Sequence, residues 1–250
     1  MIKEIKNLLS FLTTIPIKMD ENMLADAAQN MFLFPLIGAF IGVLAGLFGW
    51  VAIQILPSLV VGALVLGFLL LITGLHHADG LLDFGDGIMA HGSSERKIEI
   101  MHDQLTGAGG LSLGIMTFLI TALSIAELNR GIIVQGIVVV EVSAKLSMVI
   151  GSWAGKVVHK GMSSYFLEAM HSKKGTARLF FALVISFGIA IPLLWLTGAV
   201  TLLVAIMVSL IIVGISHRHF KGVTGDVLGA TNELTRMVSL VILLAMIRWV

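Results

Sequence analysis

Three aspartates with helical spacing are the strongest candidates for chemistry in this chain. Asp79, Asp83 and Asp86 stand at positions i, i+4 and i+7, directly after a long apolar run. A helix of 3.6 residues per turn gathers these carboxylates on one stripe. Like charges on one stripe repel each other, and no Lys or Arg occurs between Lys18 and Arg96 to separate them. A solvated acidic face is the ordinary alternative, but the pattern favours a divalent cation with oxygen ligands, and we expect Mg²⁺.

A second polar segment lies just ahead of a glycine-rich sequence. Asp103 is followed by Gly107, Gly109 and Gly110, where another apolar stretch begins. Free backbone N–H groups at a helix N-terminus there would hold a phosphate group. An N-cap followed by a flexible turn explains the same residues equally well. Taken alone, this segment leaves both readings open.

A third polar segment lies near the C-terminus. Asp226 and Glu233 are seven residues apart and would share one face of a helix, with Thr224 and Asn232 close by. An ordinary turn would also use the Thr-Gly-Asp sequence found here. Its placement on the same predicted membrane face as the three aspartates favours a shared site.

Two lysines stand among apolar residues. Lys145 and Lys156 lie near the boundary of a predicted membrane span, where ionisable groups are costly and usually functional. Lys173 and Lys174 instead form a basic run next to a glycine, and such loops most often attract anionic lipid. We therefore expect the first pair to have a functional role and the second pair to contact membrane lipid.

Carboxylates, Mg²⁺ and lysines together suit phosphoryl or nucleotidyl transfer. The metal bridges and neutralises phosphate oxygens, and cations balance the charge that develops in the transition state. Proteolysis by a zinc-activated water would need ligands such as His-Glu-x-x-His, and the sequence has no such motif. The polar residues therefore indicate an enzyme that transfers a phosphate-bearing group.

The composition places these residues in a membrane protein. Hydrophobic residues make up 57% of the 250 residues and charged residues 12%, with a mean hydropathy of +1.01. Soluble domains carry about 25% charged residues, so we expect an all-α integral membrane protein. The whole chain, 1–250, has room for one membrane-embedded domain. The absence of cysteine excludes disulfides and thiol chemistry, and we expect no nucleic-acid partner.

Seven apolar stretches are long enough to cross a membrane, which takes about 20 residues each. They predict a polytopic bundle of about seven transmembrane helices. Ahead of them, residues 2–12 combine apolar residues with Lys3, Lys6 and Asn7 and predict an amphipathic helix lying in the membrane interface. The predicted spans are 32–55, 57–75, 108–126, 131–150, 179–197, 199–216 and 235–250.

The placement of positive charge sets the orientation of these spans. With the N-terminus inside, only Arg130 and Arg248 of the 16 Lys and Arg fall outside, as the positive-inside rule requires. Every long polar segment then lies on the cytoplasmic side, and the outer turns are too short to hold an active site. We expect a multi-pass protein of the cell membrane whose active site faces the cytoplasm. The predicted cytoplasmic segments are 1–31, 76–107, 151–178 and 217–236.

Glycines recur at every fourth position of the first predicted span. They are Gly38, Gly42 and Gly46, and small residues at this spacing let two helices approach closely. The pattern favours packing within the bundle, with a homodimer as the second reading.

Three motifs give the chain a specific resemblance to a known family. They are Asp79-Gly-Leu-Leu-Asp-Phe-Gly-Asp-Gly, Ile100-Met-His-Asp103 with Gly107, and Val223-Thr-Gly-Asp-Val-Leu-Gly-Ala230. In this order, each in a predicted cytoplasmic segment, they resemble cobalamin synthase, the adenosylcobinamide-GDP ribazoletransferase family. The likeness runs nearly end to end and includes Phe34-Pro-Leu-Ile-Gly38. A weaker likeness extends to the CDP-alcohol phosphotransferases, whose full Asp-Gly-x-x-Ala-Arg pattern is missing here.

The resemblance implies a step of vitamin B12 assembly and a role for each polar candidate. A ribose hydroxyl of α-ribazole, or of its 5′-phosphate, would attack the cobinamide-bound phosphorus of adenosylcobinamide-GDP and expel GMP, with Mg²⁺ required. Asp79, Asp83 and Asp86 would bind the metal. Asp103 would be a further ligand or the base that takes the hydroxyl proton, and with Asp83 it forms the expected catalytic pair. The expected substrate contacts are His77, Lys145, Lys156, Thr224, Asp226, Asn232 and Glu233.

Some positions depart from the family pattern. Lys145 and Lys156 stand where arginines are usual, which gives up bidentate phosphate contact. Arg236 stands where an acidic residue is common. The family histidine two positions before the first aspartate would be His77, whereas a helical wheel places His76 on the aspartate face. These departures concern substrate contacts more than the metal site.

A cation-coupled secondary transporter is the competing function. Its pathway would need ionisable groups near the middle of the bilayer, and Glu141 is the one deep acidic candidate. Lys145 is one helical turn away, so an i, i+4 structural pair is the better reading of both residues. Carboxylates gathered at one membrane face would favour the enzyme, and a polar path spanning both faces would favour transport.

Overall fold

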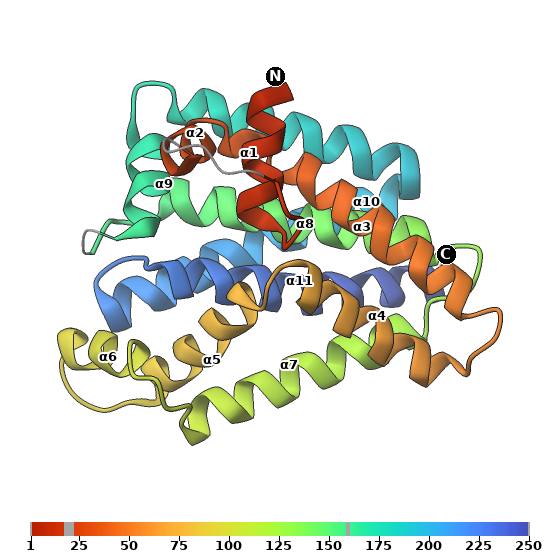
Figure 1. Cartoon of the computed structure of the whole chain (residues 1–250), viewed down its shortest axis with the longest axis horizontal. Helices are drawn as coiled ribbons and strands as arrows, with labels where there is room; N and C mark the ends of the chain where they lie inside the picture. Colours follow the sequence, from red (N-terminus) through yellow and green to blue (C-terminus); the bar gives the residue numbers. More distant parts are fainter. Residues whose placement is uncertain (1, 18–22, 159–160, 250) are drawn as a thin grey trace.

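The fold is helical throughout the described part of the chain. A computed structural model describes residues 2–17, 23–158 and 161–249, and the β pairing within these ranges is one isolated bridge between Val157 and Val223. The long helices run along the longest axis of the molecule, and the short helices gather at one end (Figure 1). In chain order the helices are α1 (Ile2–Leu12), α2 (Met23–Gln29), α3 (Phe34–Ala52), α4 (Ser58–Ile72), α5 (His76–Met89), α6 (Ser94–Met101), α7 (Ala108–Ala126), α8 (Ile133–Ala154), α9 (Met162–His171), α10 (Gly175–Phe220) and α11 (Gly225–Trp249), with a 3₁₀ turn at Met31–Leu33.

Five of the described helices, namely α3, α7, α8, α10 and α11, are long and apolar enough to cross a membrane. The count rises to six if α4 and α5, which meet at 96°, form one broken span. The chain turns between them through Gly74 and Leu75, both with left-handed φ values. We treat the five helices as the membrane-spanning segments, so α5 lies outside them. The sequence-based count of about seven spans stays a prediction.

Helix α10 is interrupted near its middle. Leu194 and Trp195 leave helical geometry, with Trp195 at a φ of 48°, and Pro192 just before them lacks the N–H that a continuous helix needs. The chain then folds so closely that a Cβ on Gly198 would lie 2.2 Å from the Ala190 carbonyl oxygen. The interruption falls where the sequence predicts a boundary between two separate spans.

Helix α8 is the core of the bundle. Every residue from Gly136 to Ser152 is buried, and helices α3, α10 and α11 pack around it. Helix α3 approaches through its repeated glycines, because a Cβ on Gly42 would lie only 2.6 Å from the Val138 Cα. The glycine pattern therefore serves packing within the chain, as the first of the two sequence readings predicts. The structure gives no support to a homodimer through these glycines, since α8 covers them.

The N-terminal amphipathic segment is helical, as the sequence predicts. Helix α1 buries Leu8 and Leu12, which are 0% and 2% exposed, and packs against α2 and α3. Its placement in the membrane interface stays a prediction.

The last helix differs from the prediction. Helix α11 begins at Gly225 rather than at residue 235, so part of the predicted cytoplasmic segment 217–236 lies inside the bundle. Arg236 is 0% exposed there. Glu141 and Glu233 neutralise its charge, which allows a polar sequence to continue into an apolar bundle.

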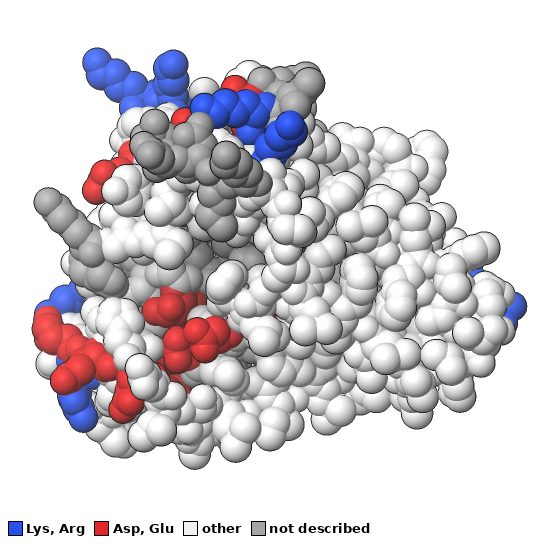
Figure 2. Space-filling model, viewed as in Figure 1, with Lys and Arg blue, Asp and Glu red and all other residues white. Residues whose placement is uncertain are grey.

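Charge is concentrated at one end of the molecule. Figure 2 shows Lys, Arg, Asp and Glu side chains gathered around the short helices, while the opposite half of this face is almost free of charge. The charged end contains the polar segments that the sequence assigns to the cytoplasm. Any site that these side chains build therefore lies at this end.

Candidate active site

A cavity of about 580 Å³ lies at the charged end of the molecule. It is bounded by α1, α2 and α9 on one side and by α5 and α11 on the other. Polar side chains come mainly from α5, α11 and the turn after α6, and apolar side chains come from the other helices. The polar lining consists of Ser10, His76, His77, Asp79, His102, Ser163 and Asp226.

Helix α5 is held against α11 by close backbone contact. A Cβ on Gly80 would lie 2.9 Å from the Asp226 Cα, and a Cβ on Gly229 would lie 3.2 Å from the His77 Cα. On the other side of α5, Leu81 and Phe84 are buried at 0% and 2% exposure, as the helical wheel predicts. The glycines thus bring the acidic edge of α5 next to the start of α11.

Asp79, Asp83 and Asp226 form an acidic cluster where these two helices meet. Asp79 is exposed and Asp83 is half-buried. Burial raises the pKa of Asp83 to about 7, and the negative charges of Asp226, Asp79 and Asp86 contribute further. The close approach of α5 and α11 brings these carboxylates together, and their mutual repulsion favours a bound cation.

Asp86 has a different environment. Its Oδ2 accepts a hydrogen bond from the Gly107 N–H at 2.6 Å, and its Oδ1 accepts one from the Gly110 N–H at 2.8 Å. Both donors belong to the first turn of α7, so Asp86 satisfies N–H groups that the helix itself leaves unpaired. A side chain on either glycine would collide with Asp86 or the backbone of α5. The glycine-rich sequence, which we considered as a phosphate site, therefore binds the carboxylate of Asp86.

The predicted magnesium site is not assembled as a set of three aspartates. Within the described ranges, no three His, Asp or Glu side chains converge as ligands of one metal ion. Asp86 accepts backbone N–H groups of α7 instead, and its predicted role as a metal ligand stays a prediction. Magnesium is usually bound by one or two carboxylates together with substrate phosphates. Asp79 and Asp83 fit a site of that kind.

Three histidines line the polar side of the cavity. His76 is exposed, whereas His77 is 7% exposed and its Nδ1 has no hydrogen-bond partner among the described residues. The helical wheel placed only His76 on the aspartate face, but both side chains reach the cavity because it extends around the first turn of α5. No role was predicted for the third histidine, His102, although the motif Ile100-Met-His-Asp103 contains it.

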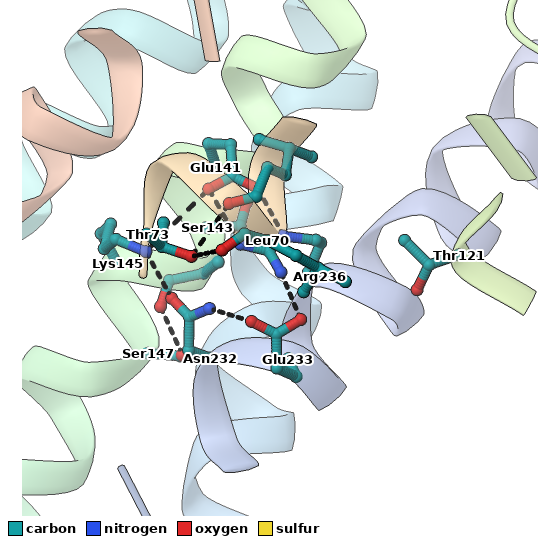
Figure 3. Close-up of polar contacts among 12 residues, drawn as sticks. Leu70, Thr73, Thr121, Glu141, Ser143, Lys145, Ser147, Asn232, Glu233 and Arg236 are labelled. Atoms are coloured by element: carbon teal, nitrogen blue, oxygen red, sulfur yellow. Dashed lines mark hydrogen bonds and ion pairs between the residues drawn. The ribbon is translucent and has the colours of Figure 1, made fainter. Parts of the chain in front are cut away.

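A buried network of charged and polar groups links α8 to α11 beside the cavity (Figure 3). Arg236 donates to Glu141 at 2.5 Å and also to Glu233. Lys145 donates to the Asn232 side-chain oxygen at 2.7 Å and lies 3.9 Å from Glu141. Asn232 in turn donates to Glu233 at 3.0 Å. The two acids and two bases neutralise each other, so the network is stable in an apolar bundle only as a complete set.

Most of the predicted substrate contacts lie away from the cavity. Lys145, Asn232 and Glu233 belong to the buried network, and each is 0% or 1% exposed. The i, i+4 pair expected between Glu141 and Lys145 is present as part of this network. A direct contact between these three residues and a substrate stays a prediction.

Three further candidates have local structural partners. The exposed Lys156 donates its backbone N–H to His217 Nε2 at 3.2 Å. Thr224 is buried and accepts the Val227 N–H at 3.3 Å, which caps the start of α11. Asp103 lies in the exposed turn after α6 and accepts the Leu105 N–H at 3.3 Å. His77 and Asp226 are the predicted substrate contacts that line the cavity.

The sequence did not reveal the apolar wall of the cavity. Phe11, Phe34 and Phe166 form a cluster of rings, with the centroids of Phe11 and Phe166 stacked 4.9 Å apart. They come from α1, α3 and α9, which are far apart in the chain. Apolar residues are too common in a membrane protein for these rings to stand out, so the tertiary structure was needed to find them.

Comparison with known proteins identifies close relatives. Residues 4–244 match the family model described as cobalamin-5-phosphate synthase. The adenosylcobinamide-GDP ribazoletransferase of Methanococcoides burtonii is 31% identical over 243 residues, which cover 93% of this chain and 88% of the relative. The enzyme of the same name from Methanocella arvoryzae is 34% identical over 247 residues (93% and 91%), and that from Thermococcus kodakarensis is 32% identical over 244 residues (98% and 99%). No solved structure matches the chain.

Proposed function

The chain belongs to the cobalamin-5-phosphate synthase family, and we propose that it joins adenosylcobinamide-GDP to α-ribazole, or to its 5′-phosphate. A ribose hydroxyl oxygen forms a bond to the cobinamide-bound phosphorus, and the bond from that phosphorus to the bridging oxygen breaks. GMP leaves with the bridging oxygen, and the hydroxyl proton passes to a base of the enzyme. The product is adenosylcobalamin or its 5′-phosphate.

The observation that supports this assignment most strongly is the convergence of three separate motifs on one cavity. Asp79 comes from the first motif, His102 from the second and Asp226 from the third, and all three line the same cavity. They come from α5, the turn after α6 and the start of α11. Acidic groups and imidazoles at a common site are suited to proton transfer and to phosphate chemistry.

We propose Mg²⁺ as the cofactor, held by Asp79 and Asp83 together with phosphate oxygens of the substrate. When bound, the ion would neutralise negative charge on the phosphates. Asp83 does not line the cavity itself, but it lies one helical turn from Asp79, which does. Burial and the nearby carboxylates raise the pKa of Asp83 to about 7, and a bound cation would offset both effects. Asp86 would support the site from a distance by fixing the start of α7 against α5.

The proton acceptor is better placed on the cavity wall than in the turn after α6. Asp103 carries a carboxylate, but it is exposed and does not line the cavity. Asp79 and Asp226 do line it. We therefore place the acceptance of the hydroxyl proton on Asp226, which leaves Asp79 for the cation.

A membrane location with this site facing the cytoplasm is part of the same proposal. The cavity lies at the charged end of the molecule (Figure 2), and the positive-inside rule assigns that end to the cytoplasm. Soluble nucleotide substrates and GMP would then enter and leave from the cytoplasmic side.

Activity of the purified protein in detergent tests the proposal. Adenosylcobinamide-GDP and α-ribazole are supplied with and without Mg²⁺, and the release of GMP and cobalamin is measured. We expect Mg²⁺-dependent product with the wild type and with Asp103→Asn, and none with Asp83→Asn or Asp226→Asn. Lack of product from folded wild-type protein would refute the assigned reaction. If Asp103→Asn lost activity and Asp226→Asn kept it, Asp103 rather than Asp226 would be the proton acceptor.

A further inference from the structure

The cavity has an apolar wall that the proposed chemistry does not use. Phe34 and Phe166 are 0% and 3% exposed, with ring centroids 5.9 Å apart, and Phe11 stacks on Phe166 from α1. Methionine side chains from four separate segments complete this wall. Aromatic rings and polarisable thioethers adapt well to a flat aromatic ligand. The methionines are Met23, Met31, Met148 and Met162.

A buried histidine with an unpartnered ring nitrogen lines the same cavity. His77 is more than nine-tenths buried, and its Nδ1 has no hydrogen-bond partner in the described part of the chain. A buried polar atom without a partner is costly, so a ligand that offers a hydroxyl group would be stabilised there. Asp79 and Asp226 lie on the same wall as His77. The cavity therefore combines an apolar side for a ring with a polar side for a sugar.

The size and chemistry of the cavity distinguish among the parts of the two substrates. A volume of about 580 Å³ suits a drug-sized ligand, and a corrinoid macrocycle carrying a nucleotide is far larger. Guanine would place its amide and amino groups against Phe and Met side chains, where they would lack hydrogen-bond partners. The dimethylbenzimidazole of α-ribazole is flat and apolar, and its ribose supplies hydroxyl groups.

We propose that the wall formed by Phe11, Phe34 and Phe166 is the subsite for the benzimidazole base of α-ribazole, with the ribose directed toward His77. This inference rests on the proposed function and adds the position of one substrate to it. The orientation brings the reacting hydroxyl to Asp79 and Asp226. The corrinoid and its GDP then approach from outside the cavity.

Binding and kinetics of a ring-deletion variant test this subsite. We would titrate purified wild type and Phe166→Leu in detergent with α-ribazole alone and with adenosylcobinamide-GDP alone, by calorimetry. We expect Phe166→Leu to weaken α-ribazole binding at least tenfold and to raise its KM by a similar factor. Binding and KM for adenosylcobinamide-GDP should change less than twofold. Phe11→Leu provides a second test if Phe166→Leu does not fold.

Phe68→Leu is the matched control, because Phe68 stacks on Phe48 at 5.2 Å and does not line the cavity. It should leave both dissociation constants unchanged. Unchanged α-ribazole binding in Phe166→Leu and Phe11→Leu would overturn the subsite, as would selective loss of adenosylcobinamide-GDP binding. If folded wild-type protein binds neither substrate, the proposed function itself fails. The two failures are distinguishable, because a protein that only places the base elsewhere would still bind both substrates.

Discussion

At the scale of single residues, the aspartates of the first motif have different tasks despite their common spacing. Asp86 accepts two backbone hydrogen bonds at the start of α7, whereas Asp79 lines the cavity. Each carboxylate oxygen of Asp86 receives one N–H. Asparagine offers only one acceptor oxygen, and its NH₂ group would face the other N–H.

Asp86→Asn is therefore expected to lower stability, whereas Asp79→Asn is expected to abolish activity and leave stability unchanged. The lost hydrogen bond and the unsatisfied N–H should cost about 1–3 kcal/mol. Thermal unfolding in detergent and the GMP-release assay would separate the two effects. Equal melting temperatures for Asp86→Asn and the wild type would show that the contact with α7 is not stabilising.

The buried network presents a related question, because its charges are stable only together. Arg236 is held between Glu141 and Glu233 inside the bundle. Removing the guanidinium leaves two carboxylates with only Lys145 as a cation, so one negative charge is uncompensated in an apolar environment.

Arg236→Met should destabilise the protein by about 3–5 kcal/mol, as expected when one partner of a buried ion pair is lost. The double variant that adds Glu233→Gln should recover part of that loss, because the remaining Glu141 and Lys145 then balance each other. Thermal unfolding of the single and double variants checks this. A double variant less stable than the single variant would mean that Glu233 has a stabilising partner other than Arg236.

At the scale of helices, glycines determine which pairs of helices come into close contact. Gly42 lets α3 approach α8, and Gly80 lets α5 approach α11, which positions the acidic cluster. Gly67 on α4 has no atom within 4 Å of its Cβ position. Gly42 and Gly80 thus leave no room for a side chain, whereas Gly67, also within a helix, does.

Gly42→Ala and Gly67→Ala form a matched pair that tests this packing. The added methyl group at position 42 would lie 2.6 Å from the backbone of α8, and overpacking of this kind costs about 1–3 kcal/mol. At position 67 the methyl group meets open space and should raise helix stability by up to about 1 kcal/mol. Melting temperatures in detergent provide the measurement. A similar change in both variants would contradict the close approach of α3 to α8.

At the scale of the whole molecule, the separation of charged and apolar ends favours an enzyme with one accessible site over a transporter. The acidic cluster and the cavity lie at the charged end (Figure 2). The deeper charges of Glu141, Lys145, Glu233 and Arg236 bind one another. They form a closed network rather than a row of sites from one face to the other.

Labelling of introduced cysteines tests the orientation, since the chain has no cysteine of its own. Glu99 in α6 and Glu127 after α7 have similarly exposed side chains, at 69% and 61%, and lie toward opposite ends of α7. In intact cells an impermeant maleimide should label Glu127→Cys, and Glu99→Cys should react only after permeabilisation. The reverse pattern would place the cavity outside the cytoplasm.

Much of the helical organisation could be predicted from the order of residues alone. Long apolar runs must form helices in a membrane to satisfy their backbone, so the stretch 108–126 coincides with α7. The spacing of Asp79 and Asp83 likewise follows from helical periodicity. The motifs were sufficient to identify the family, because each of them is a short local sequence that can be recognised without the fold.

The site itself depended on contacts between distant segments. Periodicity places Asp86 on the same stripe as Asp79, but only the approach of α7 turns it into a helix cap. The burial of Arg236 depended on Glu141 from another helix. Phe11 and Phe166 cannot be distinguished from other apolar residues in the sequence, and only the packing of α1 against α9 brings their rings together. Local sequence specifies which helices form and where their charges lie, whereas tertiary packing selects which of these side chains share a cavity, because that choice depends on long-range contacts.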